Sequence, residues 1–225
     1  MAGKPSSKAA LLVKKKVWVP IIAPELFTNQ QIGETYLEEP SQGVGRQVKV
    51  SLMVLTGDPQ RQNVAISFKI HKAENNQLFT QTIGYSIVPA AVRKMMRRGR
   101  ERVDDSFVVK TQDDVAVRVK PVLITRGRAK GGVLIDLRQQ LRLNVARAMA
   151  KLKFIDFIKD MVLHKFQREL QDSLRKIYPL QICELRDAHI ETNAKGLQNI
   201  LTAPAAPAQP PGEQPPAEAP APEAA

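Results

Sequence analysis

The sequence predicts an α+β fold in which an antiparallel β-barrel-like sheet carries an inserted basic helix and is followed by two C-terminal helices. Between residues 48 and 125, apolar side chains recur at every second position in several short segments, which is the pattern of half-buried strands. After residue 132 they recur every three or four positions, which is the pattern of amphipathic helices. The connections between the strand segments are mostly short, and this favours antiparallel pairing in a barrel or a strongly curled sheet.

The first clear strand is predicted in RQVKVSLMVL, where Val48, Val50, Leu52 and Val54 alternate with other side chains before the turn residues TGDP. NVAISFKIH repeats the alternation, and ENNQ supplies a turn into LFTQTIGYSIV. SFVVKT and VAVRVKPVLIT are joined by three polar residues and predict a hairpin. LQICELRDAHI is predicted to return as a final strand.

Three helices are predicted among and after these strands. The first follows Pro89, which suits a first helical turn, and contains the basic stretch AVRKMMRRGRER. The second is an amphipathic helix over residues 137–152, and the third is a longer helix over residues 155–177 that stops before Pro179. Phe166, on the apolar stripe of the third helix, is expected to be buried between that helix and the sheet.

Composition divides the chain into three regions. Residues 1–16 are small, polar and basic and predict a flexible arm. Residues 17–190 predict a single α+β domain that is β-rich over 17–130, helical over 133–178 and closed by a strand over 180–190. Residues 203–225 are rich in alanine and proline, have little to bury, and predict a disordered tail. The favoured role of this tail is a solubilising tether, and the alternative is a ligand for a proline-binding domain.

The charge indicates a polyanionic partner. The chain has 34 Lys and Arg against 22 Asp and Glu, a net charge of +12. Residues 93–153 alone hold 17 basic and 6 acidic side chains, so most of the excess lies in about a quarter of the chain. A field of one sign at this density favours nucleic acid or an anionic membrane surface. The long helix is evenly patterned with acids and bases on its polar side, which argues against the membrane.

Arginine dominates the basic stretch, and a guanidinium group matches phosphate oxygens in geometry and charge. On a helix, Arg93, Arg97 and Arg100 would lie at i, i+4 and i+7 on one side, with only Glu101 as an interspersed acid. No aromatic residue interrupts the stretch, so binding to the phosphate backbone is favoured over base reading. Trp18 and Tyr36 are suited either to stacking on bases or to packing. The predicted RNA-binding residues are Lys14, Lys15, Lys16, Arg93, Lys94, Arg97, Arg98, Arg100, Arg126, Arg128 and Lys130.

Catalytic and metal-binding patterns are weak. The three histidines are isolated and are expected on the solvated surface, and Cys183 is expected in the core. The pairs Asp104-Asp105 and Asp113-Asp114 are the remaining candidates for a metal, but adjacent strand residues point to opposite faces. We therefore expect no enzyme, metal, cofactor, small-molecule substrate or membrane partner. One cysteine and the lack of a long apolar segment favour a cytoplasmic protein.

Several short motifs occur together in a recognisable order. Each alone is weak, but their order and spacing are specific: IIAPELF with IGET, GR before VSL, LTGD, VRKMMRRGRERVD, KTQDD followed by RVKPV, and IYPL. Together, over about residues 15–190, they resemble the archaeal and eukaryotic ribosomal protein S-three-A-e family, also called e-S-one, and the archaeal branch most. The sequence departs from the family in Val19 after Trp18, in a shorter TRGRAKGG loop and in the Ala/Pro tail.

The resemblance implies a barrel-like sheet with flanking helices on the platform of the small ribosomal subunit, beside the messenger exit channel. It implies small-subunit rRNA near its 3′ end and neighbouring small-subunit ribosomal proteins as partners. The expected function is therefore that of a structural constituent of the small subunit that binds rRNA. The alternative is a non-ribosomal RNA-binding or RNA-chaperone protein that uses the same surface.

Overall fold

The computed structural model describes residues 15–191 and 200–201, and it confirms the α+β class. The strands are β1 Val17–Ile22, β2 Gln31–Leu37, β3 Gln47–Ser51, β4 Val64–Glu74, β5 Gln77–Ile87, β6 Arg102–Asp104, β7 Phe107–Lys110, β8 Ala116–Thr125, β9 Leu180–Ile190 and β10 Ile200–Leu201. The helices are α1 Leu52–Thr56, α2 Pro89–Met95, α3 Gly131–Met149, α4 Phe154–Val162 and α5 Lys165–Leu174, with 3₁₀ turns η1 Glu25–Phe27, η2 Pro40–Gly43 and η3 Pro59–Arg61. Residues 1–14 of the predicted arm, and the predicted tail over 203–225, lie outside the described residues.

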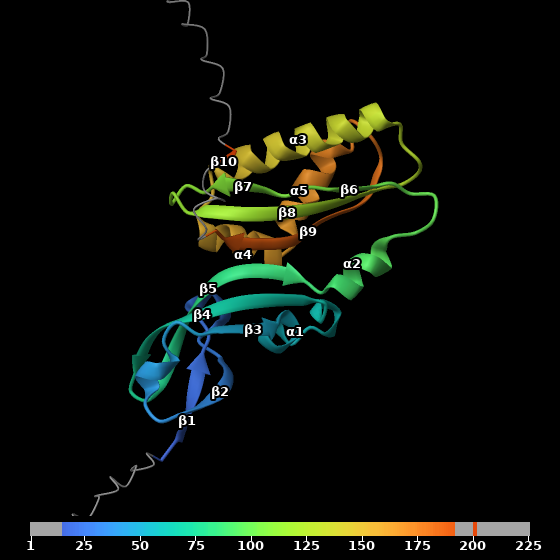
Figure 1. Cartoon of the computed structure of the whole chain (residues 1–225). Helices are drawn as coiled ribbons and strands as arrows, with labels where there is room; N and C mark the ends of the chain where they lie inside the picture. Colours follow the sequence, from blue (N-terminus) through green and yellow to red (C-terminus); the bar gives the residue numbers. More distant parts are fainter. Residues whose placement is uncertain (1–14, 192–199, 202–225) are drawn as a thin grey trace, which may run out of the picture.

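The ten strands form one sheet whose two halves meet where β5 pairs with β9 (Figure 1). One half holds β1 to β5, and the other holds β6 to β10 with the three C-terminal helices beside it. Most pairs are antiparallel, but β1 lies parallel to β5 and β10 lies parallel to β7. The path through the described strands begins at β10 and ends at β2, which do not pair with each other. The expected barrel-like closure is therefore not shown.

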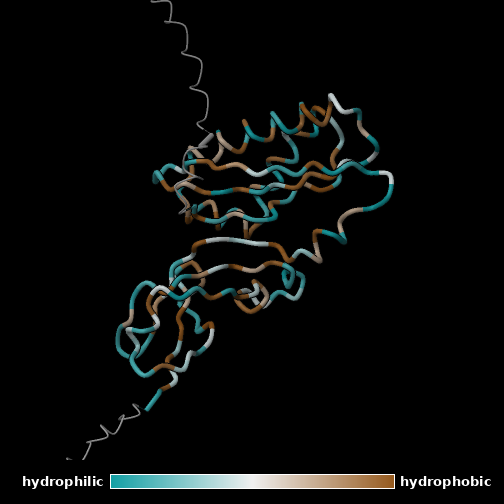
Figure 2. Tube along the Cα trace, viewed as in Figure 1, coloured by the Kyte–Doolittle hydropathy of each residue, from teal (hydrophilic) through white to brown (hydrophobic). Residues whose placement is uncertain are grey.

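The period-2 pattern predicted several strands and turns correctly. In β4 the apolar residues Val64, Ile66, Phe68 and Ile70 are all buried, and the residues between them are more exposed. Figure 2 shows hydrophobic residues, in brown, recurring along the strands of both halves. The ENNQ turn joins β4 to β5 through two asparagines that both have positive φ, as a tight hairpin turn requires. The predicted hairpin of β7 and β8 is also present.

The strand predicted through residue 54 ends earlier, at Ser51. Ser51 pairs with Ala65, and β4 begins one residue beyond that pair, so the next residues of the chain find almost no partner strand. The chain instead forms the short helix α1, which buries Leu52 and ends at Gly57 with a positive φ of 75°. The alternation of apolar residues after Ser51 therefore does not mark a continued strand, because these residues form a short helix.

The long helix predicted over residues 155–177 is two helices, so the C-terminal part holds three helices and not two. The break lies at His164, whose φ of 57° is left-handed, and α5 starts at the next residue. The buried side chain of Gln167 donates a hydrogen bond to the carbonyl of Met161 at 3.1 Å and so provides a donor for a carbonyl at the C-terminal end of α4. Phe157 and Phe166 meet edge to face across the break, with ring centroids 5.1 Å apart. The predicted burial of Phe166 is confirmed, since it is 2% exposed.

Because the helix breaks at His164, α4 and α5 can pack on different strands of the β5–β9 junction. α4 contacts β5, whereas α5 contacts β9 and α3. The main core is continuous across the junction and includes side chains from both halves of the sheet. A second, smaller core lies under the β1–β2 hairpin and consists of Val19, Ile21, Leu37, Ile70 and Leu78. Cys183 is buried in the main core, as predicted.

The junction itself is narrow and depends on a glycine. Three residue pairs join β5 to β9, and the first is Gly84 opposite His189. A Cβ added at Gly84 would lie 2.9 Å from the backbone oxygen of Ala188 and 3.0 Å from the Cβ of His189. Contacts that short force one strand to move, and backbone cannot move as cheaply as a flexible side chain can.

We expect Gly84→Ala to destabilise the protein by roughly 1–3 kcal/mol, because the added methyl group separates β5 from β9. Gly33→Ala is the matched control, since Gly33 lies in β2 and has no atom within 4 Å of its added Cβ. Urea unfolding of both variants measures the difference. Equal stability of the two variants would mean that the strands approach each other less closely than described.

Titratable side chains with shifted pKa values lie near this junction. Tyr85 Oη and Glu184 Oε2 are buried without a hydrogen-bond partner among the described residues. His164 Nδ1 lies 3.9 Å from Glu184 Oε1. Burial raises the pKa of Glu184 to about 7, and burial followed by the charges of Arg61 and Arg168 lowers the pKa of His164. His71 is exposed, as expected, and His164 and His189 are partly exposed, with 37% of each side chain accessible.

The raised pKa of Glu184 predicts a stability that falls as pH rises. Between the ordinary pKa of 4.5 and about 7, the unfolded state releases this proton while the folded state still holds it. We expect Glu184→Gln to remove that fall, so that the variant gains up to roughly 3 kcal/mol over the natural protein from pH 4 to pH 8. Unfolding free energies at several pH values test this. A constant difference between the two proteins would show that Glu184 ionises normally.

Candidate nucleic-acid interface

Helix α2 presents its cations outward because its apolar side is fixed to the core. Pro89 starts the helix, and Ala91 and Val92 are buried. Met95 and Met96 pack partly buried against the main core. The side chains of Arg93 and Lys94 are left exposed on the opposite side of this short helix.

The basic stretch is helical only as far as Met95, so the predicted row of Arg93, Arg97 and Arg100 on one helix face is wrong. Met96 is already extended, with φ −74° and ψ 132°, and Gly99 has a φ of 81° that reverses the chain toward β6. Arg97, Arg98 and Arg100 therefore lie on a loop. Packing of Met96 on the core and the conformational freedom of Gly99 end the helix before these arginines.

Thr125 holds this loop against a second basic loop, the segment between β8 and α3. Its hydroxyl accepts from the backbone N–H of Glu101 at 2.9 Å and lies 2.6 Å from the carbonyl oxygen of Gly127. Its backbone N–H donates to the carbonyl of Glu101 at 3.0 Å. Because Thr125 is 0% exposed, these bonds are shielded from water and fix both loops at one end of the molecule.

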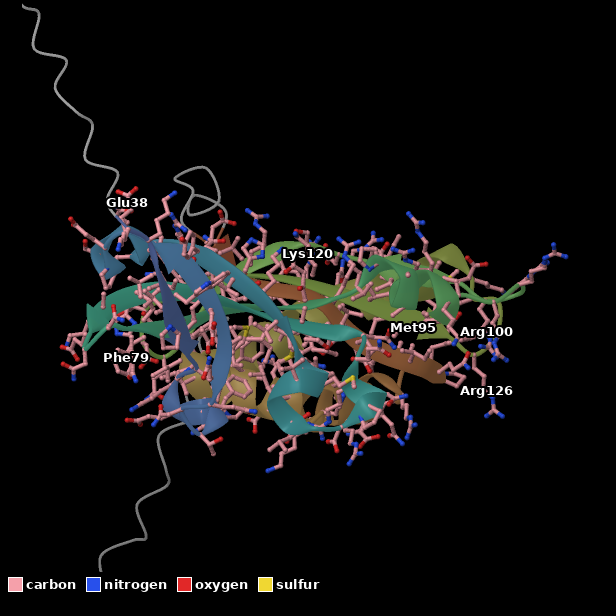
Figure 3. The ribbon with its side chains drawn as sticks, turned by 90° about the horizontal axis from the view of Figure 1, so that it is seen from below. Glu38, Phe79, Met95, Arg100, Lys120 and Arg126 are labelled. Atoms are coloured by element: carbon pink, nitrogen blue, oxygen red, sulfur yellow. The ribbon has the colours of Figure 1, made fainter. Side chains whose placement is uncertain are left out.

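The second loop is also tied to the start of β9. The backbone N–H of Arg126 donates to the carbonyl of Pro179 at 3.1 Å, and the hydroxyl of Tyr178 donates to the carbonyl of Arg128 at 2.9 Å. The IYPL motif therefore has a local role in holding the arginine loop. Figure 3 shows Arg100 and Arg126 at the same end of the molecule, each reaching outward from its loop.

We call the cations of α2 and these two loops the basic surface: Arg93, Lys94, Arg97, Arg98, Arg100, Arg126, Arg128 and Lys130. Within the described part of the chain, none of them forms an ion pair with a carboxylate. All but Arg100 are exposed. Arg100 has a buried Nη1 without a hydrogen-bond partner among the described residues, so an incoming anion is the natural partner for this group.

Other cations of α3 and of strands β6 and β8 are neutralised internally. Arg142 of α3 makes two hydrogen bonds to Asp105, at 2.5 and 2.8 Å. Burial by itself would raise the pKa of Asp105, but the bonds from Arg142 and the backbone of Ser106, with the charges of Arg142 and Arg138, lower it. Further pairs join Arg102 to Asp104, Lys120 to Asp187 and Arg118 to Glu191. The sequence did not reveal which arginines are paired in this way.

A hollow lies beside α2, and cations of the basic surface form part of its lining. Its volume is about 440 Å³, and Lys94 and Arg97 line it together with Asn63 and Gln181. Amide and cationic donors around an open hollow suit the oxygen atoms of a phosphate or sugar.

Lys15 and Lys16 are exposed where the chain enters β1, far from the basic surface at the other end of the molecule (Figures 1 and 3). Lys14 lies outside the described residues. The predicted RNA-binding residues therefore do not form one continuous patch.

The candidate metal carboxylates have other partners. Asp104 and Asp105 pair with Arg102 and Arg142. Asp113 accepts the backbone N–H of Phe154 at 3.2 Å, at the start of α4, and the carboxylate of Asp114 lies 3.6 Å from Lys110 Nζ. In the described residues there is no cluster of His, Cys, Asp and Glu that could hold a metal ion. None of the described helices is long and apolar enough to cross a membrane.

Comparison with known proteins assigns the chain to a family. Residues 6–193 match the Ribosomal S3Ae family. The chain is 34% identical over 172 residues to "Small ribosomal subunit protein eS1" of Methanobrevibacter smithii, covering 76% of this chain and 89% of that protein. It is 32% identical over 182 residues to the protein of the same name from Nanoarchaeum equitans, covering 81% and 92%. The order of motifs, the α+β fold and these similarities agree, and the chain belongs to the Ribosomal S3Ae family.

Proposed function

We propose that this protein is a structural constituent of the small ribosomal subunit and that it binds small-subunit rRNA through the basic surface. Membership of the family and the names of its relatives support the ribosomal role. The observation that supports the RNA contact is the set of cations without carboxylate partners on two loops held together by Thr125. The resemblance further supports a position on the platform, near the messenger exit channel, among neighbouring ribosomal proteins.

The arginines of this protein fall into two groups, those paired with acids and those without a carboxylate partner among the described residues. A folded protein that only needed solubility would lose little by pairing its surface arginines with nearby acids, as Arg102 and Arg142 are paired here. Holding eight cations together without acids costs repulsion, which RNA phosphates relieve as they release their own counterions. The guanidinium groups also bind two phosphate oxygens at once, which gives orientation as well as attraction.

The RNA contact predicts a change in salt dependence. In the variant Arg93→Gln, Arg97→Gln, Arg98→Gln and Arg100→Gln, we expect the plot of log affinity for small-subunit rRNA against log salt to flatten by about 3 units, at ~0.7–0.9 per lost phosphate contact. Binding is measured at several salt concentrations, and melting curves confirm that the variant is folded.

The matched control removes four cations from α5 and the residues after it, with Lys165, Arg168, Arg175 and Lys176 each replaced by Gln. These four side chains are exposed and change the net charge by the same amount. Their loss should leave the slope nearly unchanged. If both variants flatten the slope equally, RNA binding depends only on the net charge of the protein. An unaltered slope in the first variant would exclude the basic surface as the RNA-binding site.

Sedimentation separates the ribosomal role from the alternative of a free RNA-binding or RNA-chaperone protein. We expect the protein to co-migrate with small subunits and to remain bound after a moderate salt wash. If it sediments only with free RNA, the non-ribosomal alternative is correct.

A further inference from the structure

The N-terminal hairpin differs in charge from the rest of the molecule. Residues 17–45 contain four glutamates and no lysine or arginine, in a chain whose net charge is +12. This segment forms β1, η1, β2 and η2, at the end of the molecule opposite the basic surface. Figure 3 shows Glu38 at one end and Arg100 and Arg126 at the other.

The outer side of this hairpin exposes two aromatic rings. Trp18 of β1 lies directly opposite Tyr36 of β2, and the rings are 5.0 Å apart with an angle of 42° between their planes. Trp18 is 61% exposed and Tyr36 is 51% exposed. Because side chains alternate along a strand, the same side of β2 also holds Glu34, two residues before Tyr36. Glu38 follows directly after the end of β2, in the bend that leads to η2.

The fold does not need these rings for its own packing. The inner side of the hairpin carries Val19, Ile21 and Leu37, which are buried in the second core. β2 is also an end strand, which pairs with no described strand other than β1. An exposed aromatic pair beside an open strand edge is a surface that a partner chain can cover.

We propose that this acidic–aromatic face, consisting of Trp18, Tyr36, Glu34 and Glu38, binds an extended, arginine- or lysine-bearing segment of another protein. A guanidinium or ammonium group packs favourably over an indole or phenol ring. The carboxylates on either side of Tyr36 then complete the neutralisation of that cation. The open edge of β2 offers backbone hydrogen bonds to the same extended segment.

Charge decides between a basic protein segment and RNA as the occupant. An unstacked base could lie on the rings, but the nucleotide's phosphate would then approach Glu34 and Glu38, which are not paired with any Lys or Arg among the described residues. Lys15 and Lys16 lie where the chain enters β1, beside Glu38, because Val17 pairs with Leu37. Glu34 pairs with Pro20, farther along the hairpin from these two lysines. The face can be occupied while rRNA is bound, because the basic surface lies at the other end.

The chain supplies its own probe, since Trp18 is its only tryptophan. In low salt, the full-length protein is titrated with an extended peptide of alternating Thr and Arg that lacks aromatic residues, and Trp18 emission is recorded. The comparison ligands are the same peptide with Gln in place of Arg and a single-stranded oligouridylate. We expect a saturable change in emission with the arginine peptide only.

The double variant Glu34→Gln and Glu38→Gln should weaken binding of the arginine peptide roughly 3- to 10-fold, as the loss of two charge pairs at the protein surface implies. The matched control, Glu25→Gln with Glu169→Gln, removes two exposed glutamates that are not part of the acidic–aromatic face and should keep the original affinity. A response to oligouridylate that the Glu34/Glu38 variant leaves unchanged or strengthens would overturn the proposal in favour of base stacking. Absence of any saturable response to the arginine peptide, or equal weakening in both variants, would also overturn it. Because the RNA slope of the arginine variants is measured separately, failure here leaves the proposed rRNA contact intact.

Discussion

The close approach of β5 and β9 at Gly84 is the constraint on which the rest of the structure depends. Three residue pairs join the two halves of the sheet there, and the backbone of Ala188 leaves no room for a side chain at residue 84. α4 and α5 can pack on β5 and β9 at once only because the strands are adjacent and the helix breaks at His164. The Oη of Tyr85 and the Oε2 of Glu184, which are buried without a hydrogen-bond partner among the described residues, belong to these same two strands.

The junction also positions the basic surface. α2 follows β5 almost immediately, and the arginine loop after β8 is hydrogen-bonded to the residues that precede β9. Thr125 then joins the two loops, so the cations come from segments whose backbones are fixed by the sheet. Lys120 of β8 and Arg142 of α3 are paired with acids, whereas the cations of the basic surface have no carboxylate partner among the described residues. We propose on this basis that the two ends of the molecule have different partners, RNA at the basic surface and a basic protein segment at the acidic–aromatic face.

Local pattern predicted the parts of the fold that local physics controls. Alternation of apolar residues predicted β4, and the residues ENNQ predicted the turn after it. The apolar stripe predicted the burial of Phe166. It failed where tertiary contacts override periodicity: at Ser51, where the partner strand ends, and at His164, where the stripe continues through a break in the helix. The candidate arginines were identified from composition, but their arrangement was not. The bonds of Thr125 to Glu101 span 24 residues, and no local pattern reports contacts at that separation.

The opposed ends of the molecule give the most direct test of this account. An iron chelate attached to a single introduced cysteine, at Arg98→Cys or at Glu38→Cys, generates hydroxyl radicals that cleave nearby RNA in reconstituted small subunits. The natural Cys183 is buried and its pKa is raised to about 12, first by burial and then by Glu184, so it reacts poorly with the chelate. The account predicts strong cleavage of small-subunit rRNA from position 98 and weak cleavage from position 38. Equal cleavage from both positions, or stronger cleavage from position 38, would contradict it.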